Sequence, residues 1–506
     1  MKKYIYSILV LFLSIQFTGC SDHTLEELSS DPNNPSVVTP TLLLTAAQFQ
    51  VLGNYGYGWD RYAGAFVQTF AGNHATGVNA DQYNLQATDF QGDYTVTYRQ
   101  GFKDAYDIIN SQGPAAGADH HIGVAKIVMA SGLGYLTDVY GDIPYTEAWQ
   151  INTFKNPKFD SQEDIYKTIN TLLTEAIADL QKTPTLPLAG DLVHGNNPQK
   201  WIGTAYLLLA RYANHLSQVD PAGSATKALG YVDAAKAAGF TSNSWNYSLK
   251  FTNTDPNWRN PWLNLYENNL IIASESFMNR LTSSAYGSFD PRRFEYFNFT
   301  SFGAGNPYVG FTGKPNGDPT GNASYSPVGP GGYYGKTESP QLIGTYYELL
   351  FIEAEAALRA TNPGRAATAL NAAVAAQFDM VIGANTYAYT DAYYNGVHNL
   401  GLSAATVKAV IDSRVTAYKA FNAATAANVT MEKIMTEKYI AMFTMNLETW
   451  VDVRRHDWQY PTTLALPNNA FLSTFISRGL YPQSSLENNS STPKGVKMTD
   501  KLWWDK

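Results

Sequence analysis

The stretch from Ile122 to Trp149 constrains the fold more than any other part of the chain. Gly132 and Gly134 lie inside its helical pattern, where each would cost about 1 kcal/mol relative to alanine. Such glycines indicate that another helix packs closely against this face. Gly141 and Pro144 then end the helix, because proline cannot continue the hydrogen-bond ladder. The apolar residues that recur at the three- and four-residue spacing of an amphipathic helix are Ile122, Ala125, Val128, Met129, Leu136 and Val139.

The same periodicity recurs along the chain. Alanine-rich helix pairs joined by short turns, such as 353–374, are what tetratricopeptide units require, although no regular repeat is visible. The sequence therefore predicts a mainly α fold: a superhelical scaffold of tetratricopeptide-like helix pairs with few short strands. We assign this scaffold to about 94–240, 341–380 and 430–456. The expected helices begin at Pro40, near Tyr62 and near Tyr94, and further ones cover 122–140, 164–180, 198–216, 347–360, 365–377 and 430–453.

Two stretches do not fit the helical pattern. The long insertion of about 241–340 is rich in Gly, Pro, Asn and Tyr, and we expect it to be irregular but packed, because unstructured loops of this length are rare in compact domains. Within it, Asp290-Pro291-Arg292 is predicted to form a turn with an ion pair. The second stretch, 54–62, alternates glycine with aromatic residues. We expect it to interrupt the helix and to display its rings on flexible backbone.

The N-terminus predicts export. Lys2 and Lys3 precede an apolar run that is too short to span a bilayer as a helix, which indicates a signal peptide over 1–19. Cys20 is the only cysteine and follows a small residue, so we expect it to be lipidated; the alternative is an ordinary signal peptide cut elsewhere. Residues 20–40 contain Asp-Pro-Asn-Asn-Pro and are interpreted as a tether to a domain over 41–506.

The charge and the motif inventory exclude several classes of chemistry. A net charge of −8 without a basic patch argues against nucleic acid. No phosphate loop, metal motif or cofactor motif occurs, and His120 and His121 are interpreted as solvent-facing residues at a helix start. A glycosidase would need two carboxylates about 5–10 Å apart. Asp138, Asp142 and Glu147 are candidates, but for Asp138 and Asp142 we favour hydrogen bonds to the backbone of the turn at 140–145.

Several motifs, in order along the chain, resemble those of the SusD/RagB family. Leu136–Ala148 resembles its "D-x-Y-G-D-x-P-Y-x-E-A" segment, and 289–294 resembles its "D-P-R" element. Trp450–Arg455 is similar to its C-terminal helix motif "E-x-W-x-D-x-R-R". The ending with Tyr481-Pro482, Glu487 and Asn488 has one residue more than usual before the glutamate, and Trp503-Trp504-Asp505 matches the terminus of one branch.

The resemblance implies a function that the residues alone do not give. Members of this family are lipoproteins that capture nutrients outside the outer membrane for a SusC-like TonB-dependent transporter. The resemblance therefore implies an outer-membrane location facing the exterior, a non-catalytic role and no cofactor. Ser21-Asp22, with Glu26 and Glu27, resembles the acidic signal that sends such lipoproteins of the Bacteroidota to the cell surface. The ligand would be oligosaccharide or, alternatively, peptide.

The binding residues are predicted from side-chain chemistry. Sugars pack their C–H faces on aromatic rings and offer hydroxyls to amides and carboxylates, so rings on irregular backbone are the best candidates. A surface glycosidase and an adaptor without a small ligand remain the competing hypotheses. The predicted rings are Tyr55, Tyr57, Trp59, Trp258, Trp262, Tyr286, Tyr333 and Tyr334, and Asn73 and Gln82 are the predicted hydrogen-bonding residues.

Overall fold

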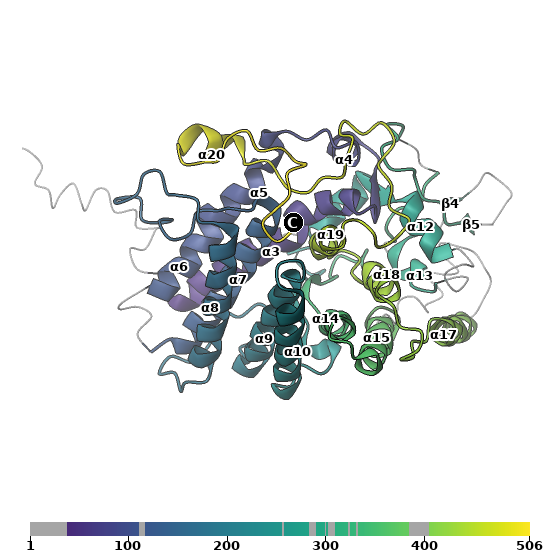
Figure 1. Cartoon of the computed structure of the whole chain (residues 1–506), viewed down its shortest axis with the longest axis horizontal. Helices are drawn as coiled ribbons and strands as arrows, with labels where there is room; N and C mark the ends of the chain where they lie inside the picture. The colour runs from purple at the N-terminus through teal and green to yellow at the C-terminus, as the bar shows by residue number, and fades with distance from the viewer. Residues whose placement is uncertain are drawn as a thin grey trace, which may run out of the picture.

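A computed structural model of the chain describes residues 38–110, 117–255, 258–282, 290–298, 300–301, 309–321, 324–329, 332–383 and 404–505. Within these ranges the protein is mostly helical, with a few strands of two to four residues (Figure 1). This confirms the predicted mainly α fold. The predicted signal peptide, Cys20 and most of the tether lie outside the described residues.

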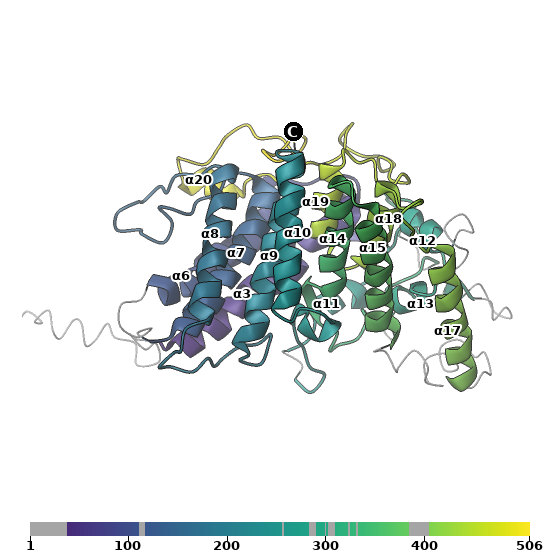
Figure 2. The same ribbon diagram turned by 60° about the horizontal axis from the view of Figure 1, so that its bottom comes forward.

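Helix pairs form the frame. α7 (Asp119–Tyr140) packs against α8 (Gln162–Leu180), α9 (Pro198–His215) against α10 (Pro221–Ala237), and α14 (Tyr346–Arg359) against α15 (Pro363–Phe378). In Figure 2 these helices stand in a row, and α17 (Ala404–Phe421) follows at one end. This packing is consistent with the tetratricopeptide-like scaffold that the sequence predicts.

The close packing predicted around α7 is present. A Cβ on Gly132 would overlap the Phe102 ring, and a Cβ on Gly134 would overlap the ring of Tyr212 on α9. The helix ends at Gly141, whose φ of +80° is readily adopted by glycine. Both glycines inside α7 therefore let neighbouring rings approach the helix backbone.

The first helix differs from the prediction. α3 (Pro40–Phe66) runs unbroken through the glycine- and aromatic-rich stretch that we expected to be irregular, and it also includes most of the helix expected to start near Tyr62. Thr39 caps it and Pro40 occupies its first turn. The glycines are tolerated because α3 is covered by other elements, mainly α7, α6 (Phe102–Asn110) and α19 (Asn446–Arg455). A Cβ on Gly58, for example, would lie 2.7 Å from the Tyr135 hydroxyl oxygen.

Two other predicted helices are divided. The one expected from Tyr94 consists of α5 (Gln91–Val96), a π-helical turn η3 (Thr97–Gly101) and α6 (Phe102–Asn110). The one expected over 430–453 consists of α18 (Met431–Ala441) and α19, separated by Thr444 at φ 64°. The other helical segments that the structure describes outside the insertion are α4 (Ala75–Asp81), η2 (Ala87–Phe90), η6 (Asp379–Gly383) and α20 (Gln483–Asn488).

The described part of the insertion is packed, as predicted, and it contains most of the described strands. β2 (Tyr247–Leu249), near the start of the insertion, pairs antiparallel with β6 (Gln341–Gly344), which comes directly after its end. β3 (Ile271–Ala273), inside the insertion, pairs antiparallel with β1 (Phe70–Gly72). β4 (Thr300–Ser301) pairs with β5 (Val309–Gly310). The helical segments described in the insertion are η4 (Asn243–Trp245), α11 (Trp262–Glu267), α12 (Glu275–Thr282) and α13 (Arg293–Tyr296).

A buried charge network crosses the core between α7, α9, α14 and α19. Arg211 pairs with Glu348, with Nε to Oε1 at 2.6 Å, and with Glu448 at 3.2 Å. His215 lies between Glu448, at 3.1 Å, and Asp138, at 3.4 Å. The network joins four helices that are far apart in the sequence.

Two further buried ion pairs lie in the same interior. Arg292 pairs with Asp290 at 2.6 Å, which confirms the Asp-Pro-Arg turn with its ion pair. Arg455 pairs with Glu355 at 2.8 Å. Among the described residues, two helices, α7 and Pro363–Gly383, are long and apolar enough to cross a membrane by length and composition, and both are mostly buried inside the protein.

Candidate ligand-binding site

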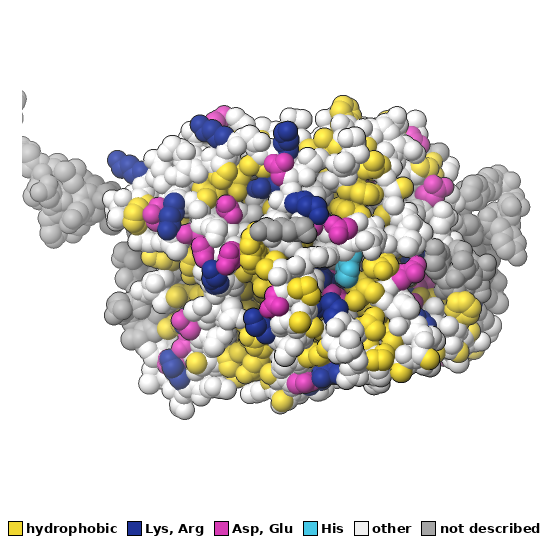
Figure 3. All heavy atoms as spheres, in the orientation of Figure 1, with side chains coloured by type: hydrophobic (Ala, Val, Ile, Leu, Met, Phe, Trp, Pro, Cys, Tyr) yellow, Lys and Arg dark blue, Asp and Glu magenta, His cyan; other side chains and the backbone are white. Residues whose placement is uncertain are grey.

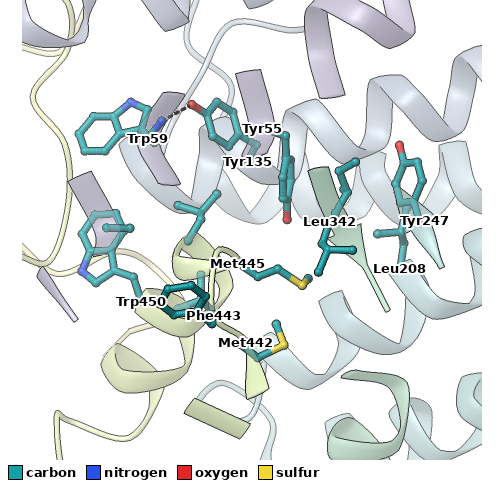
Figure 4. Close-up of a cluster of buried hydrophobic side chains, with 14 of the residues drawn as sticks. Tyr55, Trp59, Tyr135, Leu208, Tyr247, Leu342, Met442, Phe443, Met445 and Trp450 are labelled. Atoms are coloured by element: carbon teal, nitrogen blue, oxygen red, sulfur yellow. Dashed lines mark hydrogen bonds between the residues drawn. The ribbon is translucent and has the colours of Figure 1, made fainter. Parts of the chain in front are cut away.

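The first predicted aromatic group is part of the core. Trp59 is fully buried and stacks on Phe90, with ring centroids 4.3 Å apart. It also stacks on Trp450, with ring centroids 6.2 Å apart (Figure 4). The Tyr55 hydroxyl donates to Glu448 at 2.5 Å and accepts from Arg211 at 2.7 Å. The expectation that these rings are displayed at the surface is wrong, because the unbroken helix α3 turns them inward.

Tyr57 and Trp262 form a supporting layer. Trp262 is buried, and its indole N–H donates to the carbonyl of Gly56 at 2.6 Å. Tyr57 is half-buried and meets the Trp262 ring edge-on at 6.4 Å. Trp262 also stacks at 6.0 Å on Tyr266, a ring that the sequence analysis did not single out.

Tyr266 lines a recess in the insertion, which we call the insertion recess. It has a volume of about 530 Å³ and lies between α11, the loop before it and the segments around Asn298 and Lys336. Amide, carboxylate and ammonium groups surround an apolar floor, which is the usual composition of a small-molecule site. Its lining residues are Asn253, Leu263, Tyr266, Glu267, Asn269, Asn298, Pro327, Val328, Gly335, Lys336, Thr337 and Glu338.

The polar groups of the insertion recess differ in how they are held. Glu267 pairs with Arg259 at 2.5 Å on the outer side. Burial lowers the pKa of Lys336, and the carboxylates of Glu295 and Glu338 oppose that shift. Asn269 has a φ of 50°, a conformation that asparagine tolerates better than most residues, so its amide sits at a fixed bend before β3. The recess therefore offers hydrogen-bond donors and acceptors on a defined backbone.

Trp258 is the predicted tryptophan that lies nearest the surface beside this recess. It is half-buried and stacks at 5.0 Å on Phe49 of α3, which is 38% exposed. Its indole N–H donates to the carbonyl of Lys250 at 2.9 Å, which closes the loop that carries Asn253. The rings of Phe49 and Trp258 thus form a partly exposed platform that continues into the loop lining the recess.

The other predicted residues that the structure describes do not line the recess. Asn73 is buried, and its backbone N–H donates to the carbonyl of Leu270 at 2.9 Å. The side chain of Gln82 donates to the carbonyl of Gly317 at 3.0 Å. Tyr333 is half-buried and Tyr334 is buried. Tyr286 lies outside the described residues.

The candidate carboxylates have structural partners. Asp138 is buried and accepts hydrogen bonds from the Tyr166 hydroxyl at 2.5 Å and the Trp504 indole at 3.1 Å. Asp142 accepts from the backbone of Gln162 at 2.8 Å, at the start of α8. The backbone N–H groups of the turn, at Tyr145 and Thr146, donate instead to the carboxylate of Asp160.

The histidine interpretation also needs a correction. His121 is fully buried rather than solvent-facing, and its Nε2 accepts from the backbone N–H of Ala189 at 3.3 Å. Within the described ranges, no group of three His, Cys, Asp or Glu side chains is placed to hold a metal ion. On the face shown in Figure 3, Lys and Arg side chains lie scattered among Asp and Glu.

A rigid helical frame that carries a recess lined by a ring, amides and carboxylates defines a ligand-binding protein. A family model, SusD-like, described as "Starch-binding associating with outer membrane", matches residues 32–482. The chain belongs to this family. Its members are binding proteins associated with the outer membrane and nutrient uptake.

Solved structures agree with this assignment. A SusD/RagB family protein from Bacteroides thetaiotaomicron is 23% identical, with a TM-score of 0.73 over 93% of this chain and 99% of that chain. A chitin-binding protein is 25% identical, with a TM-score of 0.70 over 92% and 100%. A SusD homolog from Bacteroides fragilis is 20% identical, with a TM-score of 0.70 over 93% and 100%. Among curated protein sequences, none matches this chain.

Proposed function

We propose that this chain is a cell-surface lipoprotein that binds oligosaccharide at the insertion recess and delivers it, chemically unchanged, to a SusC-like TonB-dependent outer-membrane transporter. The lining of the recess carries the proposal: Tyr266 offers a ring, while Asn253 and Asn269 offer amides beside the carboxylates of Glu267 and Glu338. The family assignment and the chitin-binding relative support carbohydrate as the ligand class.

Binding to a defined panel tests the ligand class. Isothermal titration calorimetry with chito-, malto-, cello- and xylo-oligosaccharides and with a neutral tetrapeptide should give saturable binding to at least one glycan. Asn269→Gly removes an amide while keeping a residue that tolerates the positive φ. We expect it to weaken that glycan's affinity by roughly five- to ten-fold, the value of one or two lost hydrogen bonds.

The matched control is Asn196→Gly. Asn196 also has a positive φ, 64°, but lies in the loop before α9 and outside the recess. It should leave glycan affinity unchanged. Binding of the tetrapeptide alone would replace oligosaccharide with peptide as the ligand, and release of new reducing ends from any bound glycan would overturn the non-catalytic role.

Anchoring and delivery are tested in cells. Cys20→Ser should move the protein from the membrane to the soluble fraction and abolish incorporation of labelled fatty acid. Cells that lack the chain should lose uptake of the bound glycan and recover it with the wild-type protein but not with Cys20→Ser. Normal uptake by cells producing only the unanchored variant would contradict delivery by an anchored protein.

A further inference from the structure

A second concave site lies away from the insertion, between η3, the segment after α7 and α20; we call it the α20 groove. It has a volume of about 380 Å³, near the lower end of the roughly 300–1,000 Å³ of small-molecule sites. It shares no lining residue with the insertion recess. Its lining residues are Tyr94, Thr95, Tyr98, Arg99, Pro144, Glu147, Ala148, Trp149, Ile151, Phe154, Lys155, Pro157, Ser484, Ser485, Asn488 and Asn489.

The floor of the α20 groove presents apolar ring surface. Tyr98 and Trp149 are half-buried and stack at 6.0 Å with an interplanar angle of 23°. The Trp149 indole N–H donates to the carbonyl of Tyr98 at 2.8 Å, and the Tyr98 hydroxyl donates to the carbonyl of Pro144 at 2.9 Å. Because the polar atoms of both rings already have partners, what they offer to the groove is carbon.

The walls of the groove are fixed by the C-terminal segment. Asn489 donates to the carbonyl of Pro157 at 2.9 Å, and the backbone of Ser490 donates to Asn156 at 3.0 Å. Trp149 itself has a φ of 60°, a strained conformation for a bulky residue that persists only when the surroundings impose it. The ring is therefore held in place before any ligand arrives.

Two cations among the lining residues of the α20 groove have no partner within the described residues. Neither Arg99 nor Lys155 makes an ion pair or a side-chain hydrogen bond with the part of the chain that the structure describes, and both are exposed. The groove contains one carboxylate, Glu147, and that group accepts a hydrogen bond from the backbone of Lys158 at 2.8 Å. In a chain of net charge −8, two unpaired cations in a groove that also contains stacked rings point to an anionic ligand.

We propose that the α20 groove is a second carbohydrate site, selective for an acidic sugar residue. The C–H face of a uronic acid ring would lie against Tyr98 and Trp149, and its carboxylate would meet Arg99 and Lys155. The side chains of Ser484 and Asn488 at the rim would serve the ring hydroxyls. This inference does not depend on the insertion recess.

The lining favours a sugar over a peptide. Extended peptides are often captured by pairing with the edge of a sheet, and none of the residues that line the groove belongs to a described strand. The groove is lined by aromatic carbon, which packs well against the C–H groups of a pyranose ring. An acidic dipeptide therefore serves as a competitor in the test rather than as the expected ligand.

A matched pair of ligands tests the proposal. Methyl α-D-galacturonoside and methyl α-D-galactoside differ only in the carboxylate at C6. Saturation-transfer NMR titrations of the full mature chain in 20 mM salt should give an affinity for the acidic sugar about ten-fold higher than for the neutral one. At 300 mM salt the difference should shrink, because exposed charge pairs are screened.

Charge-removal variants locate the site. Arg99→Gln with Lys155→Gln should abolish the preference for the acidic sugar. Lys227→Gln with Lys408→Gln, which removes the same charge from α10 and α17, should preserve it, as should Asn269→Gly in the insertion recess. Phe154→Ala should weaken both sugars, because it removes groove wall without changing charge.

The overturning results are specific. Equal affinities for the two sugars, no saturable binding of either, or a preference that survives in the Arg99/Lys155 double variant would each refute the site. Loss of the preference in the Lys227/Lys408 control would show a nonspecific charge effect and would also refute it. Equal competition by N-acetyl-aspartyl-glutamate would replace the sugar with an acidic peptide.

Discussion

At the scale of single residues, the hydroxyl of Tyr266 lies in an unusual position. Its ring lines the insertion recess, but its oxygen is buried and has no hydrogen-bond partner among the described residues. Burial raises the pKa of this phenol, so it stays neutral. We expect Tyr266→Phe to preserve or raise stability by about 1 kcal/mol, because leaving a polar group buried and unsatisfied costs roughly 1–3 kcal/mol.

Chemical denaturation of the wild type and Tyr266→Phe measures this directly. Tyr83→Phe is a suitable companion, because the Tyr83 hydroxyl is also buried without a partner in the described structure but lies outside the recess. If Tyr266→Phe instead lowers the free energy of unfolding by more than 1 kcal/mol while Tyr83→Phe does not, the Tyr266 hydroxyl has a hydrogen-bond partner in the folded protein.

The buried His215 makes stability depend on pH. Burial alone would lower its pKa, but Asp138 and Glu448 outweigh burial and raise the pKa above its usual value. For Glu448, burial alone would raise the pKa, but Arg211 and His215 outweigh it and the pKa is lowered. The His215 contribution is complete below the unfolded pKa of about 6.5 and is lost as pH rises through the folded pKa. The Glu448 contribution is complete above about 4.3 and is lost as pH falls.

We therefore expect His215→Gln to be most destabilising near pH 5.5, by about 3 kcal/mol, because it leaves a buried carboxylate without its cation. The loss should shrink as pH rises toward 9. Denaturant midpoints across this range measure it, with His120→Gln as the control, since His120 is less buried and bonds only a carbonyl, that of Lys182. A loss that stays constant with pH would show that His215 is neutral in the folded protein.

The sequence predicted a packed, ring-bearing insertion but did not locate the insertion recess. The insertion was correctly expected to be packed, and Trp258 lies beside the recess within it, but Tyr266 was missed. Its signal in the sequence was its spacing, four residues after Trp262, which places both rings on one face of a helix. That signal could not be read without knowing that α11 is helical, because an element of six residues has too little periodicity to show it.

At the scale of elements, α3 shows why the glycine-rich stretch was misread. Glycine next to aromatic residues is typical of loops, yet here Gly56 and Gly58 make room for side chains from other segments. Whether a glycine is needed at these positions depends on the side chains that pack against it, and those side chains are far away in the sequence. Glycines in α7 were read correctly because the apolar periodicity around them was stronger. Local pattern thus predicts a helix only where its apolar stripe outweighs its glycines.

Two glycines in α3 provide a matched test. No atom lies within 4 Å of a Cβ placed on Gly53, so Gly53→Ala should stabilise the protein by up to about 1 kcal/mol through helix propensity. A Cβ on Gly56 would overlap the buried side chain of Gln341 in β6, so Gly56→Ala should destabilise by about 1–3 kcal/mol despite the same propensity gain. Thermal and chemical denaturation measure both, and equal effects would show that α3 does not pack as described.

At the scale of the whole molecule, segments distant in sequence meet in one core. The guanidinium carbon Cζ of Arg454, on α19, lies 3.7 Å from the centroid of the Trp450 ring. It lies 4.8 Å from the centroid of the Trp504 ring, which belongs to the C-terminal segment. The sequence predicted the helix pairs of the scaffold, because their stripes are long and regular. It could not predict that the last residues of the chain help to close the core, since a Trp-Trp pair has no periodicity. Tertiary contacts alone determine that Trp504 is buried while Trp503 is partly exposed.

The two adjacent tryptophans test this closure. Trp504 is fully buried and its indole donates to Asp138, so Trp504→Ala should destabilise by about 3–5 kcal/mol, the usual cost of a large aromatic cavity. Trp503 is half-buried, so Trp503→Ala should lower the free energy of unfolding clearly less than Trp504→Ala does. Because Asp138 also contacts His215, the Trp504→Ala loss should change with pH while the Trp503→Ala loss does not. Denaturant titrations at pH 5.5 and 9 measure both. Equal and pH-independent losses would mean that the C-terminal segment lies on the core without completing it.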